Sequence, residues 1–328
     1  MEKQEFRIVY MGTPEFAVAP LEALVSAGFN VVGVVTGPDK PVGRHQSNLT
    51  PCAVKQCALR LGLPVLQPEK LSDPQFLQAL TDWRPTLQVV VAFRILPREV
   101  WALPPMGTFN LHASLLPRYR GAAPINWAII RGDRQTGVTT FLLQQGVDVG
   151  LIIEQATVSI LPDDDAGSLA LRLQDVGARL VVSTTRLLFE GHAQPRPQQG
   201  EATLAPKIFK ETGHIDWANH TADQIHNLVR GLSPHPGTWT TLHAPAEADR
   251  PLKIFRTAPA AGSEAPALPV NATPGSLCAA GKQQSRLFVA CAGGTWLEML
   301  EVQPAGRRRM GATDFLRGLK NPENWQAR

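Results

Sequence analysis

Short apolar runs alternate with helix-like stretches over the first 190 residues of the chain. The runs contain few charged residues, which is typical of buried strands, and the stretches between them carry apolar residues at helical spacing. Strands are predicted over 6–11, 30–36, 64–68, 87–93, 108–113 and 137–144. Helices are predicted over 13–28, 51–62, 73–84 and 166–191. This alternation predicts an α/β fold, with a Rossmann-like, mostly parallel sheet that carries helices on both faces.

Two of the predicted helices have sequence signals for their first turn. Thr13 precedes Pro14 and Asp73 precedes Pro74, so each pair places a capping side chain before a proline. Gly28 suits the left-handed residue at the end of the first helix. We therefore predict that Thr13 and Asp73 cap these helices.

After residue 190 the pattern changes. Residues 191–208 are rich in Pro, Gly and Gln and predict a linker between a catalytic domain, 1–190, and a C-terminal domain, 209–328. Five short β-like runs separated by turn residues then predict a small OB-like β-barrel.

Before the barrel, one further helix is predicted over 219–232, with Asn219 or Thr221 as its cap. The segment 258–275 is typical of an irregular surface loop.

The net charge of +4 lies entirely in the last third of the chain. Residues 1–206 hold 18 Lys and Arg against 18 Asp and Glu, whereas residues 207–328 hold 14 against 10. Such an excess is either a property of the solvated surface or a surface that meets phosphates.

No apolar run is long enough for a membrane helix, and the start of the chain lacks an export signal. The four cysteines, Cys52, Cys57, Cys278 and Cys291, show no C-x-x-C spacing, so we expect small buried side chains and no metal or disulfide framework. They suit the reducing cytoplasm. Gly12 follows the first strand, but no G-x-G-x-x-G motif surrounds it, so a dinucleotide cofactor is not predicted.

Two polar residues stand at the end of one predicted strand. In GTFNLHASLLPRYRG (107–121), Asn110 and His112 are two positions apart, so they share one face of the strand. Open α/β sheets bind ligands beyond the carboxyl ends of their strands. An amide and an imidazole at that edge therefore predict a functional site.

A carboxylate, Asp148, lies between two glycines in GVDVG (146–150). Each of the three side chains alone is more typical of structural hydrogen bonding or of a turn. Together they offer no nucleophile, since no G-x-S-x-G motif surrounds Ser114. The set suits a reaction in which the substrate supplies the nucleophile, while the protein stabilises an oxyanion and moves a proton.

The segment FNLHASLLPRYRGAAPINWAI, followed by GVTT and GVDVG, resembles the folate-dependent formyltransferases. The resemblance extends over nearly the whole chain, through YMGTPEFA, VVTGPDKPVGR, VVVAFRILP, LAPKIFKETGHIDW, HNLVRGLSPHPGTW and LEVQPAGRRRMGATDFLRG. It implies that Asn110, His112 and Asp148 are catalytic, that 10-formyltetrahydrofolate is the co-substrate, and that no metal is required. RGAAPI and the C-terminal domain further imply that charged initiator tRNA, with its methionyl amino group, is the acceptor, and that the protein is a monomer.

In the reaction that the resemblance implies, the free amine attacks the formyl carbon and negative charge grows on the formyl oxygen. We expect Asn110 and protonated His112 to donate hydrogen bonds to that oxygen, each worth about 3 kcal/mol in the transition state. Asp148 is expected to pair with His112 and to pass the proton of the amine to the departing folate nitrogen.

The resemblance assigns folate contacts to the loop that follows the catalytic strand. Its residues Ser114, Leu115, Leu116 and Pro117 match the family loop, and Val91 and Phe93 are expected on the opposite wall of the pterin pocket. The alternative is a buried loop that only fills the core.

The resemblance also places tRNA contacts on basic residues. Arg44 matches a family loop that holds the acceptor end, but the residues after it, HQSNLT, lack the lysines common there. Lys207 matches a family lysine near tRNA. Arg307, Arg308 and Arg309 form a run that is either a phosphate contact or a solvated surface.

Three alternatives remain open. The first is a formyltransferase with another amine acceptor, such as a purine-pathway ribonucleotide or an amino-sugar nucleotide. The second is a hydrolase that releases formate from the same folate. The third is a non-catalytic RNA-binding protein on an enzyme scaffold.

Overall fold

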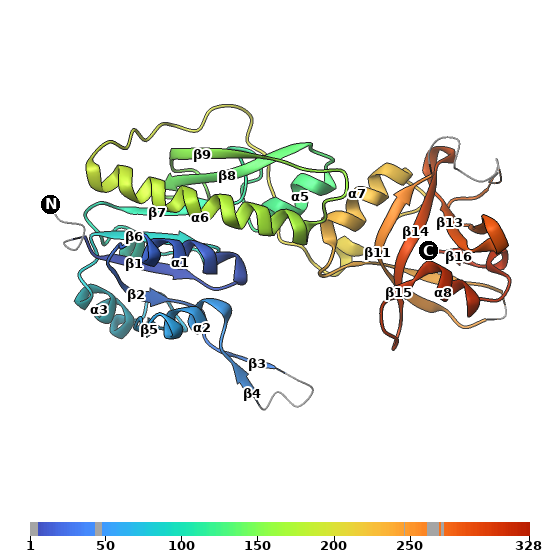
Figure 1. Cartoon of the computed structure of the whole chain (residues 1–328), viewed down its shortest axis with the longest axis horizontal. Coiled ribbons are helices and arrows are strands. Elements are labelled where there is room, and N and C mark those ends of the chain that lie inside the picture. The colour runs from blue at the N-terminus through green and yellow to red at the C-terminus, as the bar shows by residue number, and fades with distance from the viewer. Residues whose placement is uncertain (1–5, 43–47, 246, 261–268, 270–271) are drawn as a thin grey trace. The chain divides into compact units, whose positions relative to one another are not determined.

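The computed structural model describes residues 6–42, 48–245, 247–260, 269 and 272–328 (Figure 1). Contacts divide the chain into two compact units. Unit 1 comprises the residues up to Pro124, Gln135–Ser159 and Ala170–Ala205, and unit 2 comprises Ile125–Arg134, Ile160–Leu169 and Pro206–Arg328. Two short segments that precede residue 190 therefore group with the C-terminal residues.

Unit 1 contains the predicted Rossmann-like sheet. Its seven strands lie in the order β5-β2-β1-β6-β7-β8-β9, and the first five run parallel to their neighbours. The last two, β8 and β9, are antiparallel. The strands are β1 (Ile8–Gly12), β2 (Val31–Val35), β5 (Val65–Leu66), β6 (Leu87–Val91), β7 (Thr108–His112), β8 (Gln135–Leu142) and β9 (Leu151–Ser159). The mostly parallel sheet is confirmed; β9 is an additional strand.

Helices cover both faces of this sheet. On one face, Val9 and Met11 of β1 share an apolar core with Phe76 and Leu80 of α3. The alternate residue Tyr10 points to the other face, where its hydroxyl donates to the carbonyl of Ala17 (2.6 Å). The helices of unit 1 are α1 (Val18–Ser26), α2 (Ala53–Arg60), α3 (Pro74–Asp82), α4 (Arg98–Trp101) and most of α6 (Ala166–Glu190).

The first helix begins later than its sequence predicts. A 3-10 turn, Glu15–Ala17, precedes α1, and no side chain caps either one. The Thr13 hydroxyl instead accepts a hydrogen bond from the backbone N–H of Gly37 (3.3 Å), so the predicted Thr13 cap is wrong. The Asp73 cap is confirmed, since its carboxylate accepts from the N–H of Gln75 (2.9 Å).

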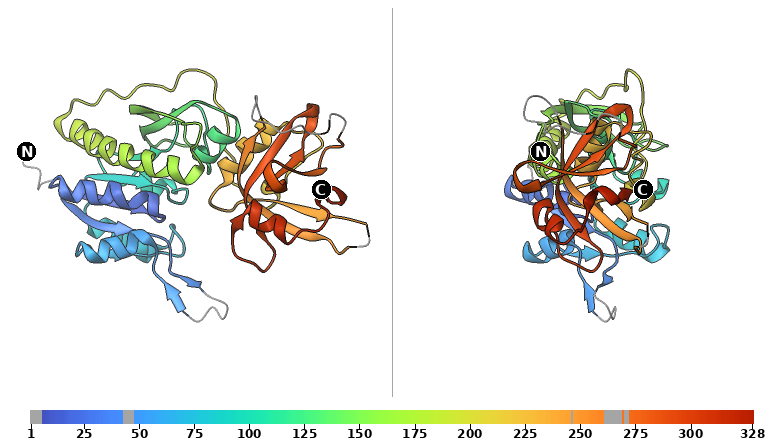
Figure 2. Two further views of the ribbon diagram at one scale, coloured as in Figure 1. Left: turned by 45° about the vertical axis from the view of Figure 1, so that its right-hand side comes forward. Right: turned by 90° about the vertical axis from the view of Figure 1, so that its right-hand side faces the viewer.

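The long helix α6 covers one face of β7, so the candidate functional side chains of that strand lie on its other face. It runs along unit 1 beside α1 (Figures 1 and 2). Gly177 allows a close approach, because a Cβ atom there would lie 2.7 Å from the side chain of Leu111 on β7. Thr184 of α6 likewise reaches the hydroxyl of Thr140 on β8 (2.7 Å). Leu111 thus faces α6, and its strand neighbours at 110 and 112 face the opposite side.

A separate two-stranded ladder pairs β3 (Lys40–Val42) with β4 (Asn48–Thr50). Arg44 lies outside the described residues, as does most of the predicted loop 258–275.

Unit 2 is a nearly closed antiparallel barrel, which confirms the predicted OB-like class. Its sheet has the order β12-β13-β14-β11-β10-β16, with β15 paired to β14. A bridge between Ser276 and Gln326 joins the two ends of the sheet. The strands are β10 (Thr238–His243), β11 (Arg250–Pro259), β12 (Leu277–Ala280), β13 (Arg286–Ala290), β14 (Trp296–Pro304), β15 (Met310–Gly311) and β16 (Gln326–Ala327).

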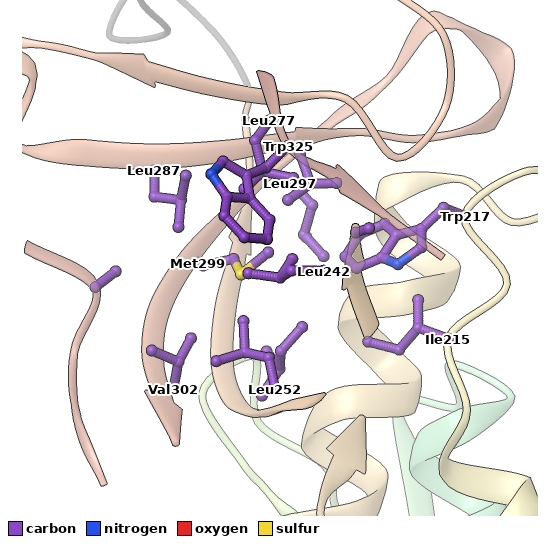
Figure 3. Close-up of a cluster of buried hydrophobic side chains, with 14 of the residues drawn as sticks. Ile215, Trp217, Leu242, Leu252, Leu277, Leu287, Leu297, Met299, Val302 and Trp325 are labelled. Atoms are coloured by element: carbon purple, nitrogen blue, oxygen red, sulfur yellow. The ribbon is translucent and has the colours of Figure 1, made fainter. Parts of the chain in front are cut away.

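The barrel has its own apolar core (Figure 3). The helices of this unit in the described part of the chain are nearly all of α5 (Pro124–Ile130), α7 (Ala222–Leu232), α8 (Ala312–Arg317) and the first turn of α6. Thr221 forms a complete capping box at the start of α7, so this cap is confirmed. The labelled core residues are Ile215, Trp217, Leu242, Leu252, Leu277, Leu287, Leu297, Met299, Val302 and Trp325. No helix within the described ranges is long and apolar enough to span a bilayer.

Candidate active site

Strand β7 brings Asn110 and His112 to the same face, as the sequence spacing predicts. Asn110 pairs in register with Val90 of β6 and Phe141 of β8, and His112 is the last residue of the strand. Both side chains therefore lie at the carboxyl end of a parallel strand, on the face that α6 leaves uncovered.

His112 is held between two acceptors. Its Nε2 atom lies 2.7 Å from the carbonyl oxygen of Tyr119, so this nitrogen carries a proton and donates. Its Nδ1 atom lies 3.8 Å from Oδ2 of Asp148. The His112 and Asp148 side chains are only 7% and 13% exposed. The sequence-predicted pair thus meets in a largely buried environment, with Oδ2 of Asp148 within ion-pair distance of Nδ1 but beyond hydrogen-bond distance.

The backbone around Asp148 is unusual. Asp148 has φ of +53°, in the left-handed region that non-glycine residues seldom occupy. Its carboxylate accepts a hydrogen bond from the backbone N–H of Gly121 (2.9 Å). Gly150 allows the turn to pass close to β8, since a Cβ there would overlap the carbonyl of Leu142. The turn therefore aims the carboxylate at the loop that follows β7.

Asn110 differs from its two neighbours in the site. Its side chain is half-buried, and it has no hydrogen-bond partner among the residues that the structure describes. Both N–H donors of its amide are therefore available to a ligand.

The loop after β7 is tightly built. The Ser114 hydroxyl donates to the carbonyl of Arg118 (2.6 Å), and the N–H of Leu116 donates to the Thr139 hydroxyl (3.1 Å). Leu116 is 3% exposed and packs with Phe141 of β8. Of the four predicted folate contacts, Ser114, Leu116 and Pro117 are buried, and Leu115 is half-buried.

The two residues expected on the opposite wall of the pterin pocket also divide into one buried and one half-buried side chain. Val91 is fully buried in β6, and Phe93 is half-buried beneath the guanidinium of Arg94, which lies 5.3 Å from the ring centroid. Burial lowers the pKa of Arg94. Ile95, which the sequence did not single out, is 80% exposed. It is the large apolar side chain that this segment presents to solvent.

The predicted tRNA residues lie on exposed surface where they are described. Lys207 is exposed, with its ammonium 5.6 Å from the ring centroid of Phe209. Arg307 and Arg308 are exposed and have no side-chain partner within the described part of the chain. Arg309 instead sits 3.5 Å above the Phe255 ring centroid and 3.8 Å from Glu301.

Two of the four cysteines, Cys57 and Cys291, are buried, and Cys52 and Cys278 are half-buried. Burial raises the pKa of Cys57 to about 11 and that of Cys291 to about 12, so both are thiols at neutral pH. Within the described residues, no group of three His, Cys, Asp or Glu side chains is placed to hold a metal. A shallow groove of about 410 Å³ lies between α1 and α6, away from these polar residues.

Several contacts of the site had no signal in the sequence. The Tyr119 carbonyl and the Gly121 N–H are main-chain groups, so their role depends on loop conformation and not on residue type. Arg120 and Gln198 form a side-chain pair in which the guanidinium donates to the amide oxygen (2.6 and 3.2 Å). Gln198 lies inside the predicted linker, where composition alone gives no reason to single it out.

Comparison with known families fits this arrangement. Residues 6–185 match the formyl transferase family, and residues 207–320 match the formyl transferase C-terminal domain. The first match alone covers more than half of the chain. The chain therefore belongs to the formyl transferase family.

Relatives that align over the full length of the chain have a more specific name than the family. Methionyl-tRNA formyltransferase of Parabacteroides distasonis is 51% identical, and the alignment covers 98% of this chain and 98% of the relative.

Solved structures share the fold at low identity. HypX of Aquifex aeolicus, in complex with tetrahydrofolic acid, has a TM-score of 0.62 and 15% identity over 94% of this chain. The chain spans about half the length of HypX, since 46% of HypX is covered. The sugar 3N-formyl transferase WlaRD, in the presence of dTDP and 5-N-formyl-THF, has a TM-score of 0.62, 16% identity and coverage of 92% of this chain and 99% of its own.

Proposed function

We propose that this protein transfers the formyl group of 10-formyltetrahydrofolate to the amino group of methionyl-tRNA. The observation that carries the proposal is the meeting of His112 and Asp148 beside an unpartnered Asn110 amide, in a chain 51% identical over its full length to a methionyl-tRNA formyltransferase. The acceptor is the charged initiator tRNA, and the reaction belongs to the cytoplasm, where charged tRNA is used. A monomeric state stays a prediction.

The residues around β7 suit a folate with a reactive formyl group. Bound 10-formyltetrahydrofolate supplies the activated formyl carbon. Exposed Ile95 and half-buried Leu115 offer apolar surface for a pterin ring, whereas Leu116 is buried against Phe141. Val91 pairs in register with Leu111, so its side chain faces α6 and not Asn110. The co-crystallised folates of HypX and WlaRD favour the same class of ligand on this fold.

In the proposed reaction the amine nitrogen attacks the formyl carbon, and the carbonyl electron pair moves to the formyl oxygen. Asn110 donates to that oxygen, since its amide has no partner within the described chain. His112 uses its Nε2 proton on the Tyr119 carbonyl (2.7 Å). It therefore contributes through the positive charge of its protonated ring, and direct donation from this nitrogen would require that bond to open.

Asp148 completes the proton transfer. Its carboxylate takes the proton that the attacking amine loses, at a position 3.8 Å from Nδ1 of His112. When the tetrahedral intermediate collapses, the bond from carbon to the folate nitrogen breaks and the proton passes to that nitrogen. Charge and atoms balance without a protein nucleophile or a metal.

The basic excess of residues 207–328 supports tRNA as the acceptor. Residues 207–328 carry 14 Lys and Arg against 10 Asp and Glu. Exposed cations such as Lys207 and the unpartnered Arg307 and Arg308 attract a polyanion and contact phosphates with little sequence preference.

The decisive experiment is a formyl-transfer assay with 10-formyltetrahydrofolate and four acceptor conditions. These are methionyl initiator tRNA, methionyl elongator tRNA, a dTDP-amino sugar, and no acceptor. We expect N-formylmethionine to form fastest on the initiator tRNA. Transfer to the amino sugar, or rapid formate release without an acceptor, would overturn the proposal in favour of a sugar enzyme or a hydrolase.

A further inference from the structure

The segment Arg196–Ala205, which directly precedes unit 2 in the chain, is fastened to both loops of the candidate site. The backbone of Arg196 bridges Ile152 through two hydrogen bonds (2.8 and 2.9 Å). The backbone of Arg120 bonds to Thr203 (2.8 Å) and Ala205 (2.7 Å). The expected linker is thus in contact with the residues that surround His112 and Asp148.

Within this segment Gln198 uses every hydrogen-bonding group of its amide. Its NH₂ group donates to the carbonyl oxygens of Asp148 (2.8 Å) and Gly150 (3.0 Å). Its oxygen accepts from Nη2 and Nε of Arg120 (2.6 and 3.2 Å). Only one orientation of the amide satisfies two carbonyls on one side and a guanidinium on the other.

Asp148 needs such support, because its left-handed backbone is intrinsically unfavourable. A non-glycine residue with φ of +53° persists only where its surroundings determine it. Two contacts hold it: the N–H of Gly121 binds the carboxylate (2.9 Å), and the Gln198 amide binds the carbonyl.

We propose that Gln198 is a positioning residue that holds the backbone of Asp148 so that its carboxylate faces Nδ1 of His112. Arg120 orients the Gln198 amide with its NH₂ group toward the two carbonyls. The inference rests on the proposed function, because it takes the Asp148 carboxylate to be the group that moves the proton.

The attachment of the segment itself does not depend on Gln198. The main-chain bonds of Arg196, Thr203 and Ala205 remain when the Gln198 side chain is changed. Substitution of Gln198 therefore tests the position of Asp148 and not the folding of the segment.

Two substitutions separate the donor and acceptor roles of the Gln198 amide. Gln198→Met has a similar size and no hydrogen bonds, whereas Gln198→Glu can still bind Arg120 but cannot donate to the Asp148 carbonyl. We expect both variants to lower kcat about 10- to 100-fold, the range that follows from misplacing a catalytic group, with little change in KM for the folate. Gln199→Met, at the exposed neighbouring position, is the matched control and should keep wild-type kinetics. Full activity in Gln198→Glu would overturn the proposal, since the hold on Asp148 is then dispensable.

A double-mutant cycle tests whether Gln198 acts through Asp148. In an Asp148→Asn background we expect Gln198→Met to cause almost no further loss of kcat. Losses that multiply in the double variant would show an independent role for Gln198 and refute the inference.

A crystal structure of Gln198→Met separates this inference from the proposed function. If the wild-type protein fails to transfer formyl groups, the proposed function falls, and the variant structure still decides the positioning role. We expect the Asp148 carboxylate to lose its bond to the Gly121 N–H. A structure with that bond and the positive φ intact would contradict the proposal. The thermal unfolding midpoint of Gln198→Met is compared with that of Gln199→Met to check that the variant is folded. If Gln198→Met does not fold, Gln198→Glu replaces it throughout.

Discussion

The charged residues proposed for chemistry in unit 1 and those proposed for tRNA binding in unit 2 lie in opposite environments. In unit 1 the His112 and Asp148 side chains are 7% and 13% exposed, and each has a fixed partner. In unit 2 Arg307 and Arg308 are exposed, and no side-chain partner holds them within the described residues. Formyl transfer needs dipoles fixed in a dry site, whereas attraction of a polyanion needs only exposed charge. Substitutions in unit 1 should therefore affect the rate of chemistry, and those on the surface of unit 2 should affect affinity.

The largest expected effect is that of Asn110→Ala. Loss of the free amide donor should lower kcat for formyl transfer about 10²- to 10³-fold, as for other oxyanion donors, with little change in KM for tRNA. Single-turnover formylation of initiator methionyl-tRNA measures it. Asn110→Asp keeps the size of the side chain and removes the donors, so it should lose as much. Activity within threefold of wild type in either variant would refute the role of Asn110.

A buried substitution in the barrel should reduce stability without touching the chemistry. Leu297 is fully buried in the unit 2 core, so Leu297→Ala should lower the free energy of unfolding by about 3 kcal/mol. Urea unfolding followed by tryptophan fluorescence measures this loss, since Trp217 and Trp325 lie in the same core as Leu297. Leu161→Ala, at a half-exposed position in unit 2, is the control and should stay within about 0.5 kcal/mol. An equal loss in both variants would contradict the assignment of the core.

A smaller effect is expected from the paired substitution Arg307→Ala with Arg308→Ala. KM for tRNA should rise severalfold at low salt with kcat unchanged, and the slope of log affinity against log salt should fall by about one per arginine. Arg317→Ala is the control, because Arg317 is an exposed arginine already paired with Asp314. An unchanged salt slope in the double variant would mean that this pair is only solvated surface.

The smallest expected effect is that of pH on the stability of unit 2 through its half-buried histidine, His226. Burial, assisted by Arg230, lowers the pKa of His226 from its ordinary value near 6.5. The unfolded chain therefore binds a proton that the folded chain does not, and the contribution to stability is present above about pH 6.5 and lost as the pH falls below it. Denaturant titrations at pH 7.5 and 5.5 should show a larger drop in unfolding free energy for the wild type than for His226→Gln. Equal drops would show that another group causes the dependence.

The site was predictable from the sequence only in part, because some of its contacts are local in sequence and others join residues far apart along the chain. Asn110 and His112 share a face because a strand repeats every two residues, which is a purely local property. Asp148 lies 3.8 Å from His112 but far along the chain, so no periodicity joins the two residues. The sequence offered it as a candidate carboxylate between two glycines, and the family resemblance implied its catalytic role. Gln198 was not predicted at all, because a Pro- and Gly-rich composition describes a linker equally well whether it is free or fastened.

The fold was predictable where hydrophobic patterning dominates. The parallel strands of unit 1 and the five main strands of the barrel follow apolar runs bounded by turn residues. The Thr13 cap failed because its hydroxyl has a competing tertiary partner, the N–H of Gly37. Strand β9 was missed because its burial falls away toward its end, and such an edge strand lacks a continuous apolar run.

The closure of the barrel by β16 has a consequence for how the protein is made. Gln326–Ala327 pairs with β10 on one side, and Gln326 bridges Ser276 on the other. Until those two residues have emerged from the ribosome, β10 and β12 are open edges that can pair with other nascent chains.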